Sequence, residues 1–248
     1  MSQTVDRAVR SLLFIADGPR SVRDVAQHLD VHPTTALRIL QTLHSWRLVD
    51  KRADGDYRLG ATILDLGQRA LESLDLRDVA APFMQKLGDA TNETVHLAIL
   101  ENQNVVYIDK VDSRRPVRMY SRVGIVAPLH CTGVAKAILA FVPPAQQRRL
   151  VESTDLHAFT PHTLTTPESL LADLAAARER GYAIDDEEHE LGIRCVSAPI
   201  LYADGNVAGS VSVSVSTARI NYEKLLAFVG PLLDAAHGIS RELGHRRR

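Results

Sequence analysis

The sequence predicts two domains: an N-terminal winged helix-turn-helix, mainly α-helical with a β-hairpin wing, and a C-terminal α+β domain with an antiparallel sheet. Three observations support this prediction. Residues 21–48 contain two short amphipathic segments separated by a break, residues 48–59 have the pattern of a hairpin, and the apolar period beyond residue 92 becomes that of β-strands. A chain of 248 residues has room for two such cores.

The helix-turn-helix is expected to begin after an amphipathic helix over residues 4–17. Ser21, with Asp24 three residues later, is a capping pair that predicts the start of the second helix. Residues 30–32 interrupt the pattern, and Pro33 suits the first position of the third helix, where a missing N–H costs nothing. The apolar face of this third helix is expected to contain Leu37, Leu40 and Leu43, with Ile39 beside them.

The other side of the third helix carries hydroxyl, amide and guanidinium groups. Such groups near the start of the second helix of a helix-turn-helix are typical of a reader of the DNA major groove. The residues expected to read bases are Thr34, Thr35, Arg38 and Gln41. For this stretch alone, an ordinary helical hairpin without a DNA function remains an alternative.

A β-hairpin is expected directly after the third helix. Residues 48–52 and 57–59 are short strand candidates, and Asp54-Gly55 lies at the centre of the turn between them. An isolated basic hairpin is usually a solvated turn, but the order of the three elements favours a DNA-binding module over residues 1–60. Its phosphate contacts are expected to be Lys51, Arg52 and Arg58.

The charge of the chain supports DNA binding only weakly. The net charge is −1; residues 1–60 have nine Lys/Arg and seven Asp, or +2, and the remainder has 20 basic and 23 acidic residues, or −3. Affinity for DNA should therefore depend on a focused patch and on oligomerisation. The polar start and the lack of a bilayer-length apolar run predict a cytoplasmic protein with no membrane partner. Two cysteines do not make a disulfide framework.

Helices connect the DNA-binding module to the rest of the chain. We expect a linker helix over residues 61–76 and an effector-binding and oligomerisation domain over residues 77–248. A helical connector couples domains more stiffly than a Gly/Ser-rich linker. Strands in hairpin pairs on either side of a helical stretch indicate an α+β domain. The expected strands are 95–100, 105–108, 117–121, 195–201 and 207–215, and the expected helices are 76–90, 133–141, 145–152, 166–180 and 222–243.

Three segments of the second domain carry polar groups that a scaffold does not require. Residues 128–136 place small and polar side chains at a loop-to-helix junction, where backbone N–H groups can hold an anion. Residues 185–190 are an acidic run, which is ordinarily a solvated loop. The hydroxyls of Ser210, Ser212, Ser214 and Ser216 alternate with valines and share one face of a strand.

The serine row has two explanations. A half-exposed antiparallel strand also alternates polar and apolar residues, because one face meets solvent and the other is buried. If helices cover the serine face, the hydroxyls line a polar cavity suited to a small oxygenated ligand. The neighbouring Cys195 is ordinarily a small core residue.

A catalytic function is the weaker interpretation. Cys131 or Cys195 could pair with a histidine as nucleophile and base, or could join Asp185 in a metal site. The candidate histidines are His96, His130 and His189. No CxxC, HExxH, GxSxG or glycine-rich phosphate loop occurs in the sequence. We therefore expect a protein that is not an enzyme and has no cofactor.

A series of motifs runs along the chain: VDRAVRSL, TTALRILQTL, YRLG, RMYSRVG, PLHCTGVAKAILA, RERGYAIDDEEHELGIRC and GSVSVSVSTARI. With these motifs the chain resembles the IclR family of bacterial transcriptional regulators over essentially its whole length. The resemblance implies a winged helix, a helical linker and a GAF-like effector domain. It also implies dimers, often associating as tetramers, that bind operator DNA and respond to a small metabolite, frequently an organic acid. Repression is the expected sign of regulation.

The resemblance also implies the residues of an effector pocket. Backbone N–H groups near Gly133 would take a carboxylate, while Asp185 would accept a hydrogen bond from a ligand hydroxyl or a water. The implied pocket residues are Met119, Ala127, Gly133, Val134, Asp185, Cys195, Ser212 and Ser214. Met119 and Ala127 would form an apolar wall, and the two serines would donate hydroxyls. A constitutive DNA-binding protein with a vestigial pocket stays open as an alternative.

Two departures from the family pattern bear on function. Pro33 stands where relatives often have a lysine, which removes one cationic DNA contact. Ala135 replaces a common glycine before Lys136 and is expected to add a methyl group near the pocket. The operator and the ligand are therefore not transferable from relatives.

Overall fold

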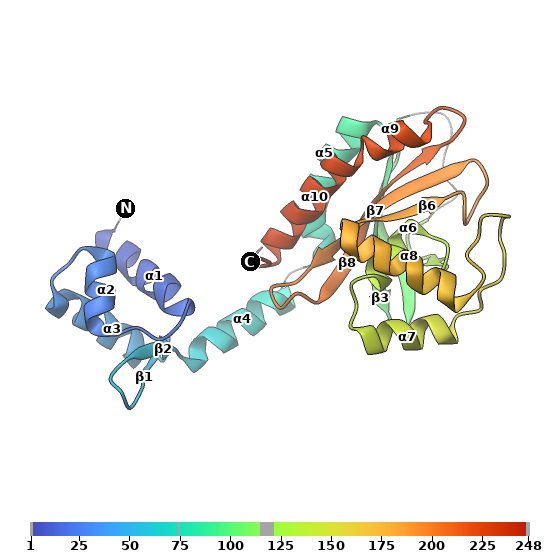
Figure 1. The fold of residues 1–248 in the computed structure, drawn as a ribbon. Helices are drawn as coiled ribbons and strands as arrows, with labels where there is room; N and C mark the ends of the chain where they lie inside the picture. The colour runs from blue at the N-terminus through green and yellow to red at the C-terminus, as the bar shows by residue number, and fades with distance from the viewer. Residues whose placement is uncertain (1, 74, 115–121, 247–248) are drawn as a thin grey trace. The chain divides into compact units, whose positions relative to one another are not determined.

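The computed structural model describes residues 2–73, 75–114 and 122–246. The chain forms two compact units, Met1–Ser73 and Leu74–Arg248, drawn in blue to cyan and in green to red in Figure 1. The strand expected over residues 117–121 lies outside the described residues, and Met119 with it. Of the helices described, none is long and apolar enough to cross a membrane.

The first unit contains the three expected helices, α1 (Gln3–Ala16), α2 (Val22–Leu29) and α3 (Pro33–Ser45). The predicted capping pair is present at the start of α2. The N–H of Asp24 donates to Ser21 Oγ at 3.2 Å, and the N–H of Ser21 donates to the Asp24 carboxylate at 3.0 Å. Two N–H groups that the helix leaves unpaired are thereby satisfied.

The buried face of α3 differs from the expected one. Leu37 is only partly buried, and Ala36 is fully buried in its place. The buried residues are Ala36, Ile39, Leu40 and Leu43. The buried face of α3 is therefore rotated about the helix axis towards Ala36. The small side chain at this position allows α2 and α3 to approach closely.

The predicted wing follows α3 as β1 (Val49–Lys51) and β2 (Tyr57–Leu59), paired antiparallel. Arg20 forms an antiparallel bridge to β2. Its N–H donates to the Tyr57 carbonyl at 3.0 Å, and the N–H of Tyr57 donates to the Arg20 carbonyl at 2.8 Å. A single bridging residue leaves no alternation in the sequence, so this element was not predicted. The expected helix after the wing is α4 (Ala61–Ser73).

The second unit contains one antiparallel sheet of described strands in the order β5-β4-β3-β8-β7-β6. Strands from the two ends of the unit meet at the β3–β8 pair, which confirms the α+β class. Two strands were not predicted, since β5 has two residues and β6 ends in the first two residues of the acidic run. The strands are β3 (Thr94–Glu101), β4 (Asn104–Val111), β5 (Val126–Ala127), β6 (Ala183–Asp186), β7 (Ile193–Leu201) and β8 (Val207–Ser216).

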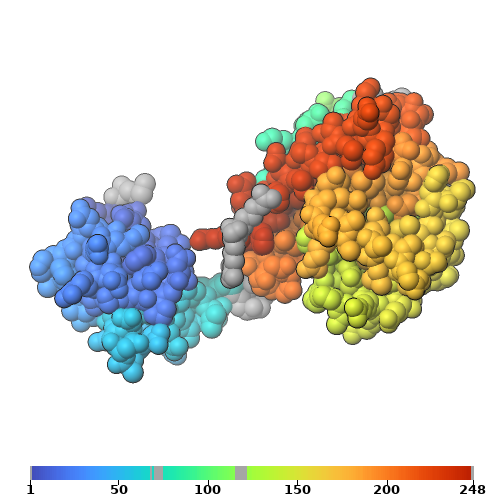
Figure 2. Space-filling view, viewed as in Figure 1, coloured from blue at the N-terminus to red at the C-terminus, as the bar shows by residue number. Residues whose placement is uncertain are grey.

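Helices cover both faces of this sheet (Figure 1). One face carries α5 (Leu76–Thr91) and α10 (Val229–Glu242), and the other carries α6 (Gly133–Leu139) and α8 (Pro167–Arg180). Helix α7 (Pro144–Ser153) packs on α8, and Figure 2 shows this layer from outside in yellow-green to orange.

The helix expected over 222–243 is two helices, because α9 (Tyr222–Leu226) ends before α10 begins at Val229. Pro231 has no N–H to donate to the carbonyl four residues earlier, so a new helix starts around it.

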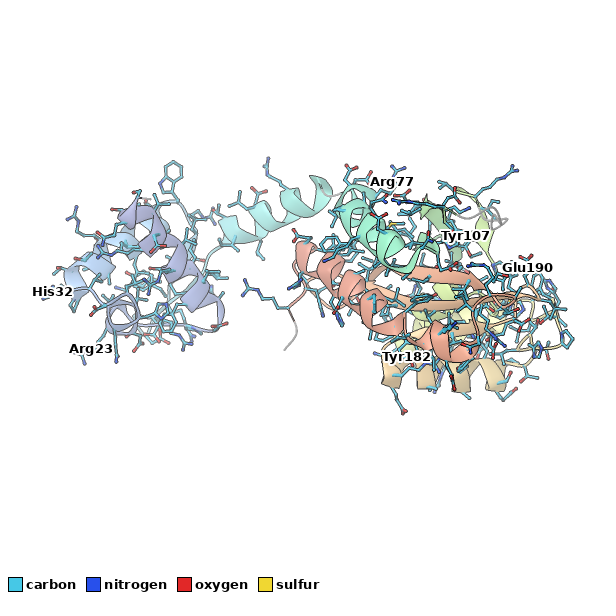
Figure 3. The ribbon with its side chains drawn as sticks, turned by 90° about the horizontal axis from the view of Figure 1, so that it is seen from above. Arg23, His32, Arg77, Tyr107, Tyr182 and Glu190 are labelled. Atoms are coloured by element: carbon cyan, nitrogen blue, oxygen red, sulfur yellow. The ribbon has the colours of Figure 1, made fainter. Side chains whose placement is uncertain are left out.

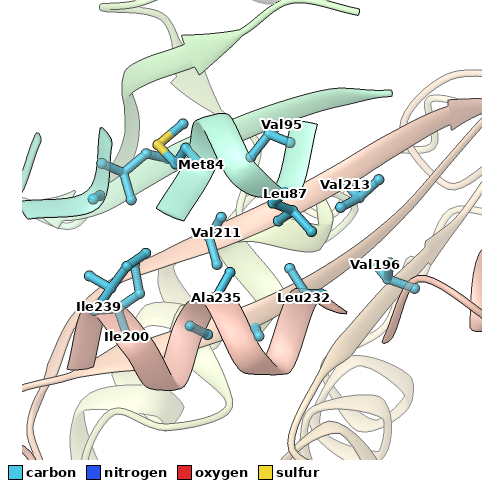
Figure 4. Close-up of a cluster of buried hydrophobic side chains, with 14 of the residues drawn as sticks. Met84, Leu87, Val95, Val196, Ile200, Val211, Val213, Leu232, Ala235 and Ile239 are labelled. Carbon is cyan, nitrogen blue, oxygen red and sulfur yellow. The ribbon is translucent and has the colours of Figure 1, made fainter. Parts of the chain in front are cut away.

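The strand period separates an apolar face from a polar one. The apolar face packs on Met84 and Leu87 of α5 and on Leu232, Ala235 and Ile239 of α10, as Figure 4 shows. The strand residues on this face are Val95, Leu97, Val196, Ile200, Val211 and Val213. The residues between them, which include the serine row, point to the α6 side.

Candidate functional site

Three of the four serines in the row are buried, and Ser216 at the end of β8 is partly exposed. Ser210, Ser212 and Ser214 have exposed fractions of 3% or less, so the explanation of a half-exposed strand is wrong for this sheet. Ser210 Oγ donates to the carbonyl of Val134 at 2.9 Å, which ties β8 to α6. The hydroxyls of Ser212 and Ser214 face a cavity.

A cavity of about 580 Å³ lies over the polar face of the sheet. Among the expected effector residues, those that line it are Gly133, Val134, Asp185, Cys195, Ser212 and Ser214. Ala127 is buried on β5 between two lining residues, Val126 and Pro128, without lining the cavity itself. The structure thus gathers segments that are far apart in sequence around one space.

Further lining residues were missed as ligand contacts, notably His96 and Tyr107. Figure 3 labels Tyr107 and another lining residue, Glu190. His96 was considered only as a catalytic base. A period of two along β3 separates it from Val95 and Leu97, and this polar side chain between apolar neighbours is the signal that could have found it.

The floor of the cavity is a chain of polar side chains across four strands. Asp185 on β6 is opposite Cys195 on β7, which is opposite Ser214 on β8. Cys195 Sγ lies 3.0 Å from Ser214 Oγ, and Asp185 is a further hydrogen-bonding partner of the thiol. Ser214 Oγ and Ser212 Oγ lie 3.3 and 3.4 Å from Nδ1 of His96 on β3.

His96 is a neutral member of this chain. Burial lowers its pKa to about 3, and the positive charge of Lys110 acts in the same direction. A neutral imidazole has one nitrogen that accepts and one that donates. His96 can therefore pair with hydroxyl groups without carrying charge into the cavity.

Asp185 is not in the solvated loop that the acidic run suggested. It lies in β6 with an exposed fraction of 3%, and Glu188 is buried as well. Burial and the nearby Glu188 carboxylate raise the pKa of Asp185 to about 7, although Lys136 opposes this shift. The N–H of Glu188 donates to Asp185 Oδ1 at 2.9 Å and fixes the carboxyl group.

A buried ion network holds the turn after β6. Lys136 on α6 has no exposed surface, and its Nζ lies 2.6 Å from Glu188 Oε1 and 2.9 Å from Asp173 Oδ2 on α8. The carbonyl of Glu188 also accepts from the hydroxyl of Thr163 at 2.6 Å. These bonds position the segment that presents Asp185 to the cavity.

The start of α6 requires a glycine. A Cβ atom on Gly133 would overlap the hydroxyl oxygen of Ser197 and lie 3.2 Å from Cβ of Cys195. The N-cap residue, Thr132, donates its hydroxyl to the Pro128 carbonyl at 2.8 Å and does not cap the helix. Ala135 is fully buried in the same apolar cluster as the lining residue Val134 and does not itself line the cavity.

The expected base-reading residues lie on α3. Thr34, Arg38 and Gln41 are exposed, whereas Thr35 is partly buried in a groove shared with Thr4 of α1. His32, labelled in Figure 3, caps α3: its Nδ1 accepts from the N–H of Thr34 at 3.4 Å and lies 2.9 Å from Thr34 Oγ1. The hydroxyl of Thr34 is therefore already engaged.

The basic residues of the wing do not form one patch. Lys51, Arg52 and Arg58 are exposed. Arg58 pairs with Asp50 in the hairpin, whereas Lys51 pairs with Tyr57. Because neighbouring residues of a strand point to opposite faces, Arg58 and Lys51 lie on opposite faces of the hairpin. Arg52 makes an ion pair with Asp54 at 3.3 Å.

The geometry gives little support to catalysis. Burial raises the pKa of both thiols, Cys131 and Cys195, which keeps them protonated and poorly nucleophilic. Within residues 2–73, 75–114 and 122–246, no group of three or more His, Cys, Asp or Glu side chains is placed to hold a metal ion.

The chain is similar to known proteins over nearly its whole length. Residues 68–241 match a family model described as bacterial transcriptional regulator IclR C-terminal, and residues 4–53 match one described as IclR helix-turn-helix domain. The transcriptional regulator XynR of Escherichia coli K12 is 33% identical over 98% of both chains. The repressor AllR of the same strain is 31% identical over 98% of this chain and 91% of its own. The crystal structure of the Agobacterium tumefaciens repressor BlcR is 26% identical, with a TM-score of 0.83 over 98% of this chain and 97% of that one.

Proposed function

Because this chain belongs to the IclR family of bacterial transcriptional regulators, we propose that it is a repressor whose binding to operator DNA is controlled by a small oxygenated effector, an organic acid, in the cavity of its second unit. The observation that carries the effector half of this proposal is the buried polar floor of that cavity, since desolvating hydroxyl, thiol and imidazole groups is costly unless they have partners. The family and its curated relatives are regulators and not enzymes.

The effector is held, in this proposal, between the start of α6 and the sheet. Gly133 and Val134 present backbone at one end of the cavity, and Ser212 and Ser214 present hydroxyls from its floor. Asp185 and Cys195 close the side next to β6 and β7. Ala127 belongs to the apolar surroundings, and the role of Met119 as apolar wall is retained from the family resemblance.

The DNA-binding half uses the exposed side of α3 and the wing. We assign base reading to Arg38 and Gln41, with Thr34 and Thr35 as hydroxyl contacts near the helix start. Lys51, Arg52 and Arg58 contact phosphates. We assign residues 1–60 to the DNA-binding domain, 61–76 to the linker, whose helix α4 ends at Ser73, and 77–248 to the effector domain.

A homodimer, or a tetramer built from it, would place two or more copies of α3 on double-stranded operator DNA. An effector that binds one arrangement of the subunits better than another shifts the population towards that arrangement and changes the half-site spacing. This links the cavity to the DNA without any direct contact between them.

The test is a thermal-shift screen of the purified full chain against aliphatic and aromatic carboxylic acids, followed by operator binding. A ligand at 100 times its dissociation constant stabilises the folded protein by about 2.7 kcal/mol, a shift that is easily measured. The proposal expects a hit that is lost in Ser212→Ala and that changes the affinity for duplexes selected by the protein from random-sequence DNA. Operator binding insensitive to every hit would instead indicate a constitutive regulator with a vestigial pocket.

A further inference from the structure

The lining of the cavity is rich in oxygen but has no cation among its described residues. Its charged side chains are Asp185 and Glu190. The lining histidines, His96 and His189, have pKa values lowered by burial and stay neutral. The nearby Lys136 is fully buried behind the cavity, where Glu188 and Asp173 balance its charge. Among the residues that the structure describes, the negative charge of an organic acid would therefore meet no lysine or arginine in this lining.

The polar floor can offer a hydrogen-bond donor to the ligand instead. One oxygen of Asp185, Oδ1, already accepts from the N–H of Glu188 at 2.9 Å, and the N–H of His189 is a further donor to the carboxyl group. The carboxyl group also faces the Cys195 thiol, whose other neighbour is Ser214 Oγ at 3.0 Å. When Asp185 is ionised, the thiol donates to it; when Asp185 is protonated, its O–H is itself a donor. The protonation state of one residue therefore decides whether this end of the floor accepts or donates.

We propose that Asp185 recognises the carboxylate of the effector as a neutral acid, donating its O–H to a ligand oxygen, so that an ionised Asp185 takes up one proton when the effector binds. This rests on the proposed function and refines it: the effector is a monoanionic acid whose charge is balanced by a proton. No covalent bond forms or breaks except the O–H bond of Asp185, and the proton comes from solvent. Asp185 is then a donor to the ligand and not the acceptor that the family resemblance suggested.

The surroundings of Asp185 favour this state. Burial and the Glu188 carboxylate raise the pKa of Asp185 to about 7, and a bound anion would raise it further. Burial also raises the pKa values of the neighbouring thiols and of the phenol, so they stay protonated. The titratable groups around Asp185 are Cys195 of β7, Tyr107 of β4, Cys131 and Lys136 at α6, and Glu188 and His189 of the following turn.

The inference is tested by titration calorimetry on the full chain with matched carboxylates and carboxamides, such as lactate with lactamide and benzoate with benzamide. Each is measured at pH 6 and pH 8 in two buffers that differ in ionisation enthalpy, which reports the protons taken up. If only protonated Asp185 binds the carboxylate, its fraction falls about tenfold between these pH values around a pKa of about 7, and the dissociation constant rises by the same factor. Asp185→Asn should abolish this pH dependence and the proton uptake, whereas Glu101→Gln, at an exposed acid outside the lining, should keep both.

A readout on the unmodified protein covers the case in which Asp185→Asn fails to fold. Adding the carboxylate at pH 8 should increase the infrared C=O band of a protonated carboxyl group, and the carboxamide should not. A carboxylate that binds equally at pH 6 and pH 8 without proton uptake overturns the inference and leaves the regulator intact. A panel in which only carboxamides bind, or in which no carboxylate binds at either pH, overturns it as well. Binding of the same protein to DNA selected from random sequences decides separately whether the proposed regulator stands.

Discussion

Nζ of Lys136 lies 2.6 Å from Oε1 of Glu188, although the two residues are 52 positions apart in the chain. The pair joins α6 to the turn after β6 and is buried away from solvent. A charge pair in such a place stabilises little relative to apolar side chains, but removing one member leaves the other uncompensated. Its role is to hold the two segments that flank Asp185 in one arrangement.

Breaking this pair should destabilise the second unit strongly. Lys136→Met leaves Glu188 and Asp173 without their cation, and we expect a loss of about 3–5 kcal/mol in the free energy of unfolding, measured by urea denaturation. The surface pair Arg114–Asp89 of the same unit is the control, since Arg114→Met should cost less than about 1 kcal/mol. Equal effects at the two sites would show that the buried pair does not hold the turn.

Asp185 should make stability depend on pH. Its pKa in the folded protein is raised to about 7, above the ordinary value of 3.8, so the folded state binds more protons than the unfolded one between these values. The contribution is fully present at low pH and is lost as pH rises through about 7. Asp185→Asn should therefore gain stability relative to wild type from pH 4 to pH 7 and keep a constant gain above pH 8 in urea unfolding. A difference that does not change with pH would contradict this assignment.

Gly133 should not tolerate a methyl group. Gly133→Ala brings a Cβ against Ser197 Oγ, and overpacking of this kind costs about 1–3 kcal/mol while displacing the start of α6 from the cavity. Adding Ser197→Ala should restore much of the loss, because it removes the clashing hydroxyl. Ser197 Oγ has no hydrogen-bonding partner within the described part of the chain, so its deletion costs little. Gly230→Ala in α10, where the added Cβ meets nothing within 4 Å, is the neutral control in the same unfolding assay.

The exposed cations of the first unit should affect DNA binding in different ways. Arg38→Ala should cost about 1–3 kcal/mol and relax discrimination at one base position if its guanidinium pairs with a guanine. Arg58→Ala should weaken binding to all sequences alike and reduce the salt dependence by about one phosphate contact. Fluorescence anisotropy with selected and scrambled duplexes at several salt concentrations separates the two effects. Unchanged discrimination in Arg38→Ala would contradict its assignment as a base reader.

Local rules predicted the elements whose signals are local. The capping pair at Ser21 and Asp24 placed the start of α2, and the apolar period placed α4 over Ala61–Ser73. The period of two predicted β3, β4, β7 and β8 and placed the serines of β8 on one face. Two short strands were not predicted from the local pattern. Strand β5 has only two residues, and the acidic residues of β6 are typical of a loop.

The sequence by itself determined the order of elements, the DNA-binding module and the family, because periodicity, caps and motifs are properties of neighbouring residues. Only the tertiary structure decided which polar groups meet. Burial of the serine face depends on α6 lying over it, and that depends on the absence of a side chain at Gly133 next to Ser197. The pKa of Asp185 depends on its burial in β6 and on Glu188, which Lys136 holds in place. Desolvation and charge act through space, so the chemistry of the cavity follows from packing between distant segments.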